Sequence, residues 1–80
     1  MRKMFEIGEW YWIKDDNFNG KPFGKIIQNI KSRLYLVRLC TVKKDGSSTI
    51  LDKNSLCNRE SIGEKLASDE FRRYAMVLEI

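Results

Sequence analysis

The alternation of hydrophobic and polar positions near the N-terminus predicts a short β-strand. Residues 9–14 alternate between the two faces of an extended chain and are rich in aromatic and β-branched residues. Because successive side chains of a strand point to opposite faces, Trp10 and Trp12 share one face. Tyr11 and Ile13 share the other face. At least one aromatic side chain must therefore point away from any core on one side of this strand.

Four strands joined by turns are expected between residues 9 and 51. The third is apolar on both faces, which is typical of a central strand. A loop dense in turn-forming residues, 15–22, follows the first strand, and Asp45-Gly46 is a strong hairpin signal before the fourth. The predicted strands are 9–14, Gly24–Ile30, Arg33–Val42 and about Ser48–Leu51, with Lys31-Ser32 as the tight connection between the second and third.

The last third of the chain has a helical pattern. Ser61, with Glu64 three residues later, fits a capping box for a short helix. Ser68-Asp69-Glu70 fits the start of a second helix, since the helix dipole favours acidic residues there. Hydrophobic residues then recur along one helical face, at Phe71, Tyr74, Ala75 and Leu78. The alternative is a final strand over residues 74–80 that closes the sheet; the helix is favoured.

Several short strands joined by one long loop and tight hairpins predict a mainly β fold. We expect one domain over residues 1–80. It would consist of a small four- or five-stranded barrel at about 5–52 and a C-terminal helical segment at about 60–80.

A resemblance to known small barrels supports this fold class. The run Phe5–Ile13 resembles the opening of Src-homology-3-like barrels, and the runs 23–30 and 34–38 are similar to KOW and Tudor-type modules. The resemblance covers about residues 5–52. It implies a binding module, because such barrels recognise peptides, modified side chains, RNA or DNA.

The composition excludes several catalytic classes. The chain has no histidine, so neither a Ser-His-Asp nor a Cys-His arrangement can form. The two cysteines, Cys40 and Cys57, supply at most half of a zinc shell and are expected to be reduced. We therefore predict no enzyme, no cofactor and no metal site. No apolar run approaches the roughly 20 residues that span a bilayer, and no signal peptide is evident, so a cytoplasmic protein is expected.

The net charge of +4 is distributed unevenly. Residues 1–44 carry ten Lys or Arg and four Asp or Glu, whereas residues 45–80 carry five and seven. A basic first half suits a polyanion or an acidic protein face. Six cations could border the aromatic strand and bind nucleic acid: Lys14, Lys21, Lys25, Lys31, Arg33 and Arg38. The negative charges of Asp15 and Asp16 in the adjoining loop argue against a row of cations that binds phosphates.

The first strand and its neighbouring loop are the candidate partner surface. Large aromatic side chains supply contact area at low entropic cost and are frequent in binding hot spots. The candidate partner-binding residues are Trp10, Tyr11, Trp12, Phe18 and Tyr35. The other interpretation is that the outward aromatic side chains pack under the C-terminal helix through Phe71 and Tyr74.

Two functions remain open. The first is a non-catalytic, monomeric protein that docks on a larger protein or nucleoprotein complex. The chain starts with Met and is rich in Lys, Ile and Asn, as are many small inhibitors and regulators of phages and mobile elements. The alternative is a nucleic-acid-binding module of the Src-homology-3-like (KOW or Tudor) type. Neither function involves a membrane.

Overall fold

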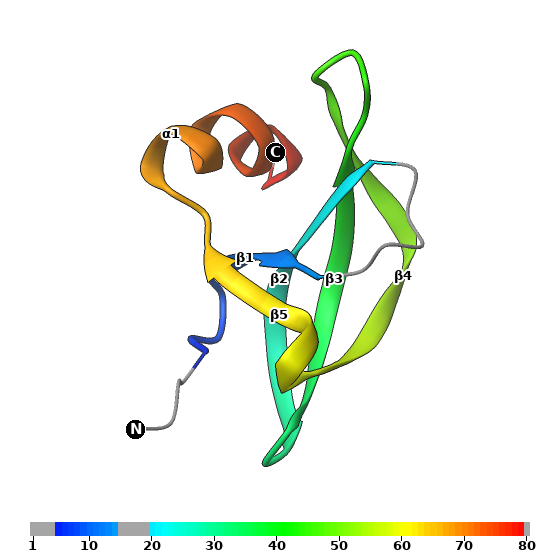
Figure 1. Cartoon of the computed structure of the whole chain (residues 1–80), viewed down its shortest axis with the longest axis vertical. Helices are drawn as coiled ribbons and strands as arrows, with labels where there is room; N and C mark the ends of the chain where they lie inside the picture. Colours follow the sequence, from blue (N-terminus) through cyan, green and yellow to red (C-terminus); the bar gives the residue numbers. More distant parts are fainter. Residues whose placement is uncertain (1–4, 15–19, 80) are drawn as a thin grey trace.

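Five antiparallel strands form one sheet in a computed structural model that describes residues 5–14 and 20–79 (Figure 1). The strand order is β4-β3-β2-β1-β5, so the fold is mainly β as predicted. β4 and β5 are the two edges of the described sheet and do not pair with each other, so the expected closure into a barrel is not observed. The strands are β1 (Trp10–Ile13), β2 (Lys21–Lys31), β3 (Leu34–Val42), β4 (Ser48–Asn58) and β5 (Ile62–Lys65).

The prediction of a helix starting near Ser61 is wrong. β4 continues well past its predicted end and leads into η1, a 3₁₀ turn over Arg59–Ser61, and then into β5. β5 pairs with β1, and its first residue, Ile62, is buried in the sheet's inner core. Strand pairing and burial of Ile62 thus outweigh the local capping signal, as tertiary context often does.

The β2–β3 and β3–β4 hairpins form where the turn signals predicted them. Gly46 adopts a φ of +89°, a left-handed conformation that favours glycine. The Ser47 N–H donates to Asp45 Oδ1 at 2.9 Å, and hydrogen bonds from Ser47 lower the pKa of Asp45. In β2, a Cβ on Gly24 would lie 2.2 Å from Val37 Cγ1, so only glycine permits this approach of β2 to β3.

Two hydrophobic cores lie on opposite faces of the sheet. The inner core consists of Phe5, Tyr11, Ile13, Ile26, Tyr35, Val37, Leu39, Cys57 and Ile62. The outer core is built on Trp10, Phe23, Cys40, Leu66 and Ala75, with Trp12, Val42, Phe71, Tyr74 and Leu78 packed against it. An 80-residue chain thus divides its apolar side chains between two thin layers that share one sheet.

The C-terminal segment is helical and covers the outer core (Figure 1). It consists of α1 (Ser68–Glu70), the π-helical η2 (Phe71–Ala75) and the 3₁₀ segment η3 (Met76–Glu79). The Ala67 N–H donates to Glu70 Oε1 at 2.9 Å, which satisfies a backbone donor at the helix start. The alternative of a closing strand over residues 74–80 is therefore wrong for 74–79, and residue 80 lies outside the described part. No helix in the described ranges is long and apolar enough to cross a membrane.

Candidate functional site

The aromatic side chains expected to bind a partner lie mostly in the interior. Trp10 is 2% exposed, Tyr11 4% and Tyr35 8%. On the inner face, the Phe5 ring makes edge-to-face contacts with Tyr11 and Tyr35, at centroid distances of 5.2 and 5.3 Å. Phe18, the remaining aromatic candidate, lies outside the described residues. Trp12 is half-buried, so none of the four described candidates is a largely exposed side chain.

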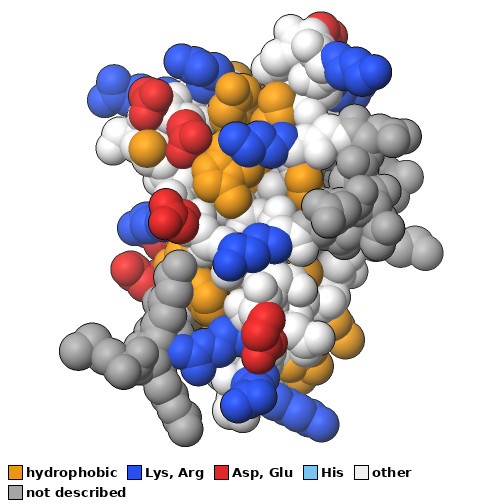
Figure 2. Space-filling model, in the orientation of Figure 1, with side chains coloured by type: hydrophobic (Ala, Val, Ile, Leu, Met, Phe, Trp, Pro, Cys, Tyr) orange, Lys and Arg blue, Asp and Glu red, His pale blue; other side chains and the backbone are white. Residues whose placement is uncertain are grey.

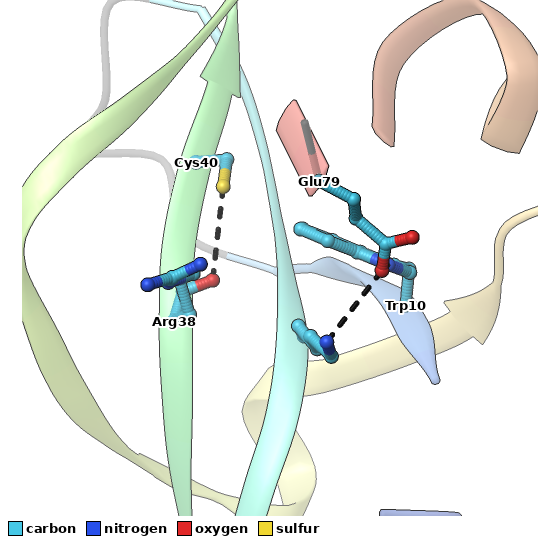
Figure 3. A network of polar contacts seen from close by, with 5 residues as sticks. Trp10, Arg38, Cys40 and Glu79 are labelled. Carbon is cyan, nitrogen blue, oxygen red and sulfur yellow. Dashed lines mark hydrogen bonds and ion pairs between the residues drawn. The ribbon is translucent and has the colours of Figure 1, made fainter. Parts of the chain in front are cut away.

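Trp10 and Trp12 pack under the C-terminal helix. Trp10 Nε1 donates to Glu79 Oε1 at 3.1 Å, and Trp12 Nε1 donates to Glu70 Oε1 at 3.2 Å. Figure 3 shows Glu79 beside the Trp10 indole, with an ion pair to a neighbouring strand. The Trp12 ring also lies 6.1 Å from that of Tyr74. Of the two interpretations of the outward aromatic face, packing under the helix is the one that the structure shows.

Only three of the six candidate basic residues, Lys14, Lys21 and Lys25, adjoin the first strand. Lys25 pairs with Glu79 at 3.5 Å, and Lys21 lies over the Trp12 ring at 4.3 Å. Arg33, in the turn between β2 and β3, lies 3.9 Å from Glu60. Lys14, Lys31 and Arg38 are exposed, at the end of β1, at the end of β2 and within β3. Figure 2 shows the same mixture, with basic and acidic side chains interspersed over the face in view.

An uncovered part of the outer sheet face carries exposed aliphatic side chains beyond the end of the helix. Lys25 and Arg38 are cross-strand partners on this face, since Lys25 reaches Glu79 of η3. The next set of cross-strand partners on this face spans three strands, since Leu36 of β3 lies opposite both Gln28 of β2 and Leu56 of β4. Leu56 is 60% exposed and Leu36 is half-buried.

A register shift in β2 adds a further aliphatic side chain to this face. The pairing of β2 with β3 is irregular between Ile26 and Gln28, which is the signature of a β-bulge. Ile26 is fully buried in the inner core, whereas the next residue, Ile27, is 37% exposed and lines a shallow depression with Lys25 and Arg38. We call this set (Lys25, Ile27, Leu36, Arg38 and Leu56) the uncovered sheet face.

Sequence reasoning did not find the uncovered sheet face. The apolar character of both faces of β3 was a signal, because Leu36 alternates with the buried Tyr35 and Val37. The position of Ile27 could not be anticipated, since a bulge changes the alternation on which face assignments rest.

The cysteines of the described chain are buried, and its acidic side chains are not clustered. Both Cys40 and Cys57 are buried and outside any disulfide. Burial raises the pKa of Cys40 from its ordinary 9.0 to about 11, against the smaller opposing effect of the Arg38 charge. Cys40 Sγ lies 3.8 Å from the Arg38 carbonyl oxygen (Figure 3). Within residues 5–14 and 20–79, no group of three or more Cys, Asp or Glu is placed to hold a metal ion.

Comparison of the chain with protein-family models, with curated proteins and with solved structures finds no match.

Proposed function

We propose that the protein is a non-catalytic binding module that docks on another protein through the uncovered sheet face. The observation that carries the proposal is the aliphatic row of Leu36 of β3 and Leu56 of β4 together with Ile27 at the bulge of β2, with two of the three side chains exposed. Aliphatic side chains that adjoin one another on a surface mark interaction sites more often than single ones do.

The charges beside this row favour a partner of a particular kind. Lys25 and Arg38 lie side by side next to the aliphatic row, and Arg38 is exposed. An interface with an apolar centre and a charged rim is typical of protein complexes. The complementary partner surface would have an apolar centre and an acidic rim, and the net charge of +4 would assist its approach.

At the uncovered sheet face, a protein partner is favoured over nucleic acid by the distribution of the basic side chains. A nucleic-acid track needs cations that gather along one path. Here Lys25 pairs with Glu79, and Lys21 lies over an indole ring. The small antiparallel sheet and its tight hairpins support a Src-homology-3-like module, and a role as regulator or inhibitor of a larger complex forms part of this proposal.

An affinity capture with matched variants tests the proposal. The immobilised protein would be exposed to a lysate of its own source organism, with and without nuclease. We expect a protein to be retained in both cases, lost with Leu56→Asp and kept with Val77→Asp. Val77 is a suitable control because it is 53% exposed on η3, outside the uncovered sheet face. Loss of the captured protein on nuclease treatment, or equal capture by both variants, would contradict the proposal.

A further inference from the structure

A cavity of about 290 Å³ with a mainly basic lining lies at the end of the molecule that holds η1. Figure 1 places η1 and the turn between β2 and β3 at the same, lower end of the view, although more than 20 residues of chain separate them. Figure 2 shows Lys and Arg side chains around an acidic side chain there. The lining residues are Phe5, Lys14, Arg33, Arg59, Glu60 and Ile62.

Backbone hydrogen bonds hold the three cations of this cavity together. The Arg59 N–H donates to the Arg33 carbonyl at 2.8 Å, which ties η1 to the β2–β3 turn. The Lys14 N–H donates to the Ser61 carbonyl at 2.7 Å, which ties the end of β1 to η1. Asn29 Nδ2 donates to the Lys31 carbonyl at 2.7 Å, which adds a side-chain hydrogen bond to the turn. The positions from which the three cationic side chains project are therefore fixed before any ligand arrives.

Positive charge exceeds negative charge among the lining residues. Among the residues that the structure describes, Glu60 is the one acidic residue that lines the cavity, against Lys14, Arg33 and Arg59. The Arg33–Glu60 separation is 3.9 Å and both side chains are largely exposed, so this ion pair is weak and easily exchanged. Two guanidinium groups suit an oxyanion, because each offers paired N–H donors to two oxygens.

We propose that this basic cavity binds a phosphate group of a nucleic-acid backbone. A backbone phosphate is favoured over an acidic peptide because the apolar floor, Phe5 and Ile62, is buried, so the cations around the floor would make the contacts with the ligand. Lys31, exposed at the end of β2 beside the same turn, extends the positive surface beyond the cavity. Such a contact positions a nucleic acid without reading its sequence. The site is separate from the uncovered sheet face, so it would let the protein hold nucleic acid while it docks on a protein.

Titration with a fluorescent single-stranded oligonucleotide at several salt concentrations tests the cavity. We expect Arg33→Ala and Arg59→Ala each to weaken binding several-fold and to reduce the slope of log affinity against log salt by roughly one. Lys44→Ala and Arg72→Ala remove equal charge from exposed positions elsewhere and are expected to change the slope less. Equal effects of all four variants would overturn the proposal, since binding would then depend on net charge alone.

A variant expected to bind the oligonucleotide more tightly provides a second test, because a variant that fails to fold would not gain affinity. Glu60→Gln removes the carboxylate that competes with the ligand for Arg33, so it is expected to strengthen oligonucleotide binding more than Glu64→Gln does. A phosphorylated peptide with the same fluorescent label is titrated in parallel with the oligonucleotide. Binding of that peptide, with no binding of the oligonucleotide, would overturn the assignment to nucleic acid, and so would an unchanged affinity in Glu60→Gln. Neither result would affect the docking proposal, which rests on other residues.

Discussion

At the scale of single residues, the indole groups of Trp10 and Trp12 explain the positions of two glutamates in the C-terminal segment. A buried indole N–H needs an acceptor, and these two find carboxylates in the C-terminal segment, Glu79 and Glu70. Glu79 lies 69 residues from Trp10 along the chain, and Glu70 lies 58 residues from Trp12. Nothing in the local pattern connects them, so the alternation of β1 gave the faces of the two Trp residues correctly but not their partners.

The Glu79 contacts lead to a prediction about stability. Glu79→Ala removes both the acceptor of the Trp10 N–H and the ion pair with Lys25. Because Glu79 is partly exposed, we expect a loss of about 1 kcal/mol in the free energy of unfolding, measured by urea denaturation. Glu79→Gln keeps an acceptor and should lose less. A loss no larger than that of the exposed control Glu64→Ala would show that the hydrogen bond contributes nothing.

Cys40 leads to a prediction about pH. Its pKa is raised to about 11 in the folded protein, so the thiol of the unfolded chain ionises first. The contribution of the neutral thiol to stability is complete below about pH 9 and is lost as the pH rises towards 11. We therefore expect a fall in stability between pH 9 and 11 that is smaller in Cys40→Ala, whatever the variant's stability at neutral pH. Identical pH dependence in the two proteins would contradict this account.

At the scale of elements, the C-terminal segment acts as the second layer of the fold. Its helical spacing was predictable, since Phe71, Tyr74, Ala75 and Leu78 recur on one face and all pack in the outer core. The capping signal at Ser61 failed because it describes only local preference. The same stretch pairs with β1 and buries Ile62, which local preference does not record.

Removal of this segment is expected to destabilise the whole protein. A chain truncated before Ser68 would expose Trp10, Phe23 and Cys40, all of which are now buried. Full exposure of a large apolar side chain costs about 1.5–3 kcal/mol, so the loss should exceed about 3 kcal/mol. Thermal unfolding followed by circular dichroism would measure it. A truncated chain that melts with the full-length protein would mean that the segment is an appendage.

At the scale of the whole molecule, the sequence was sufficient for the mainly β class and the C-terminal helical segment, but insufficient for the open sheet and for the surface. Turn residues such as Asp45-Gly46 and the alternation of β1 and β3 predicted most of the sheet. The candidate aromatic residues that the structure describes pack in two cores rather than one. What remains exposed depends on where the helix ends and where β2 bulges. Those features placed Ile27 and Leu56 on the surface, and they arise only from tertiary packing.

The central claim is that the uncovered sheet face, and not the aromatic strand, binds the partner. The most direct measurement is the Kd of the captured partner for Leu56→Asp beside Val77→Asp, two exposed positions on different surfaces. A charge placed in the apolar centre of an interface should weaken binding by at least tenfold, or about 1.4 kcal/mol, while the control keeps the affinity of the parent protein. Equal affinities for the two variants, or a larger loss with Val77→Asp, would contradict the account.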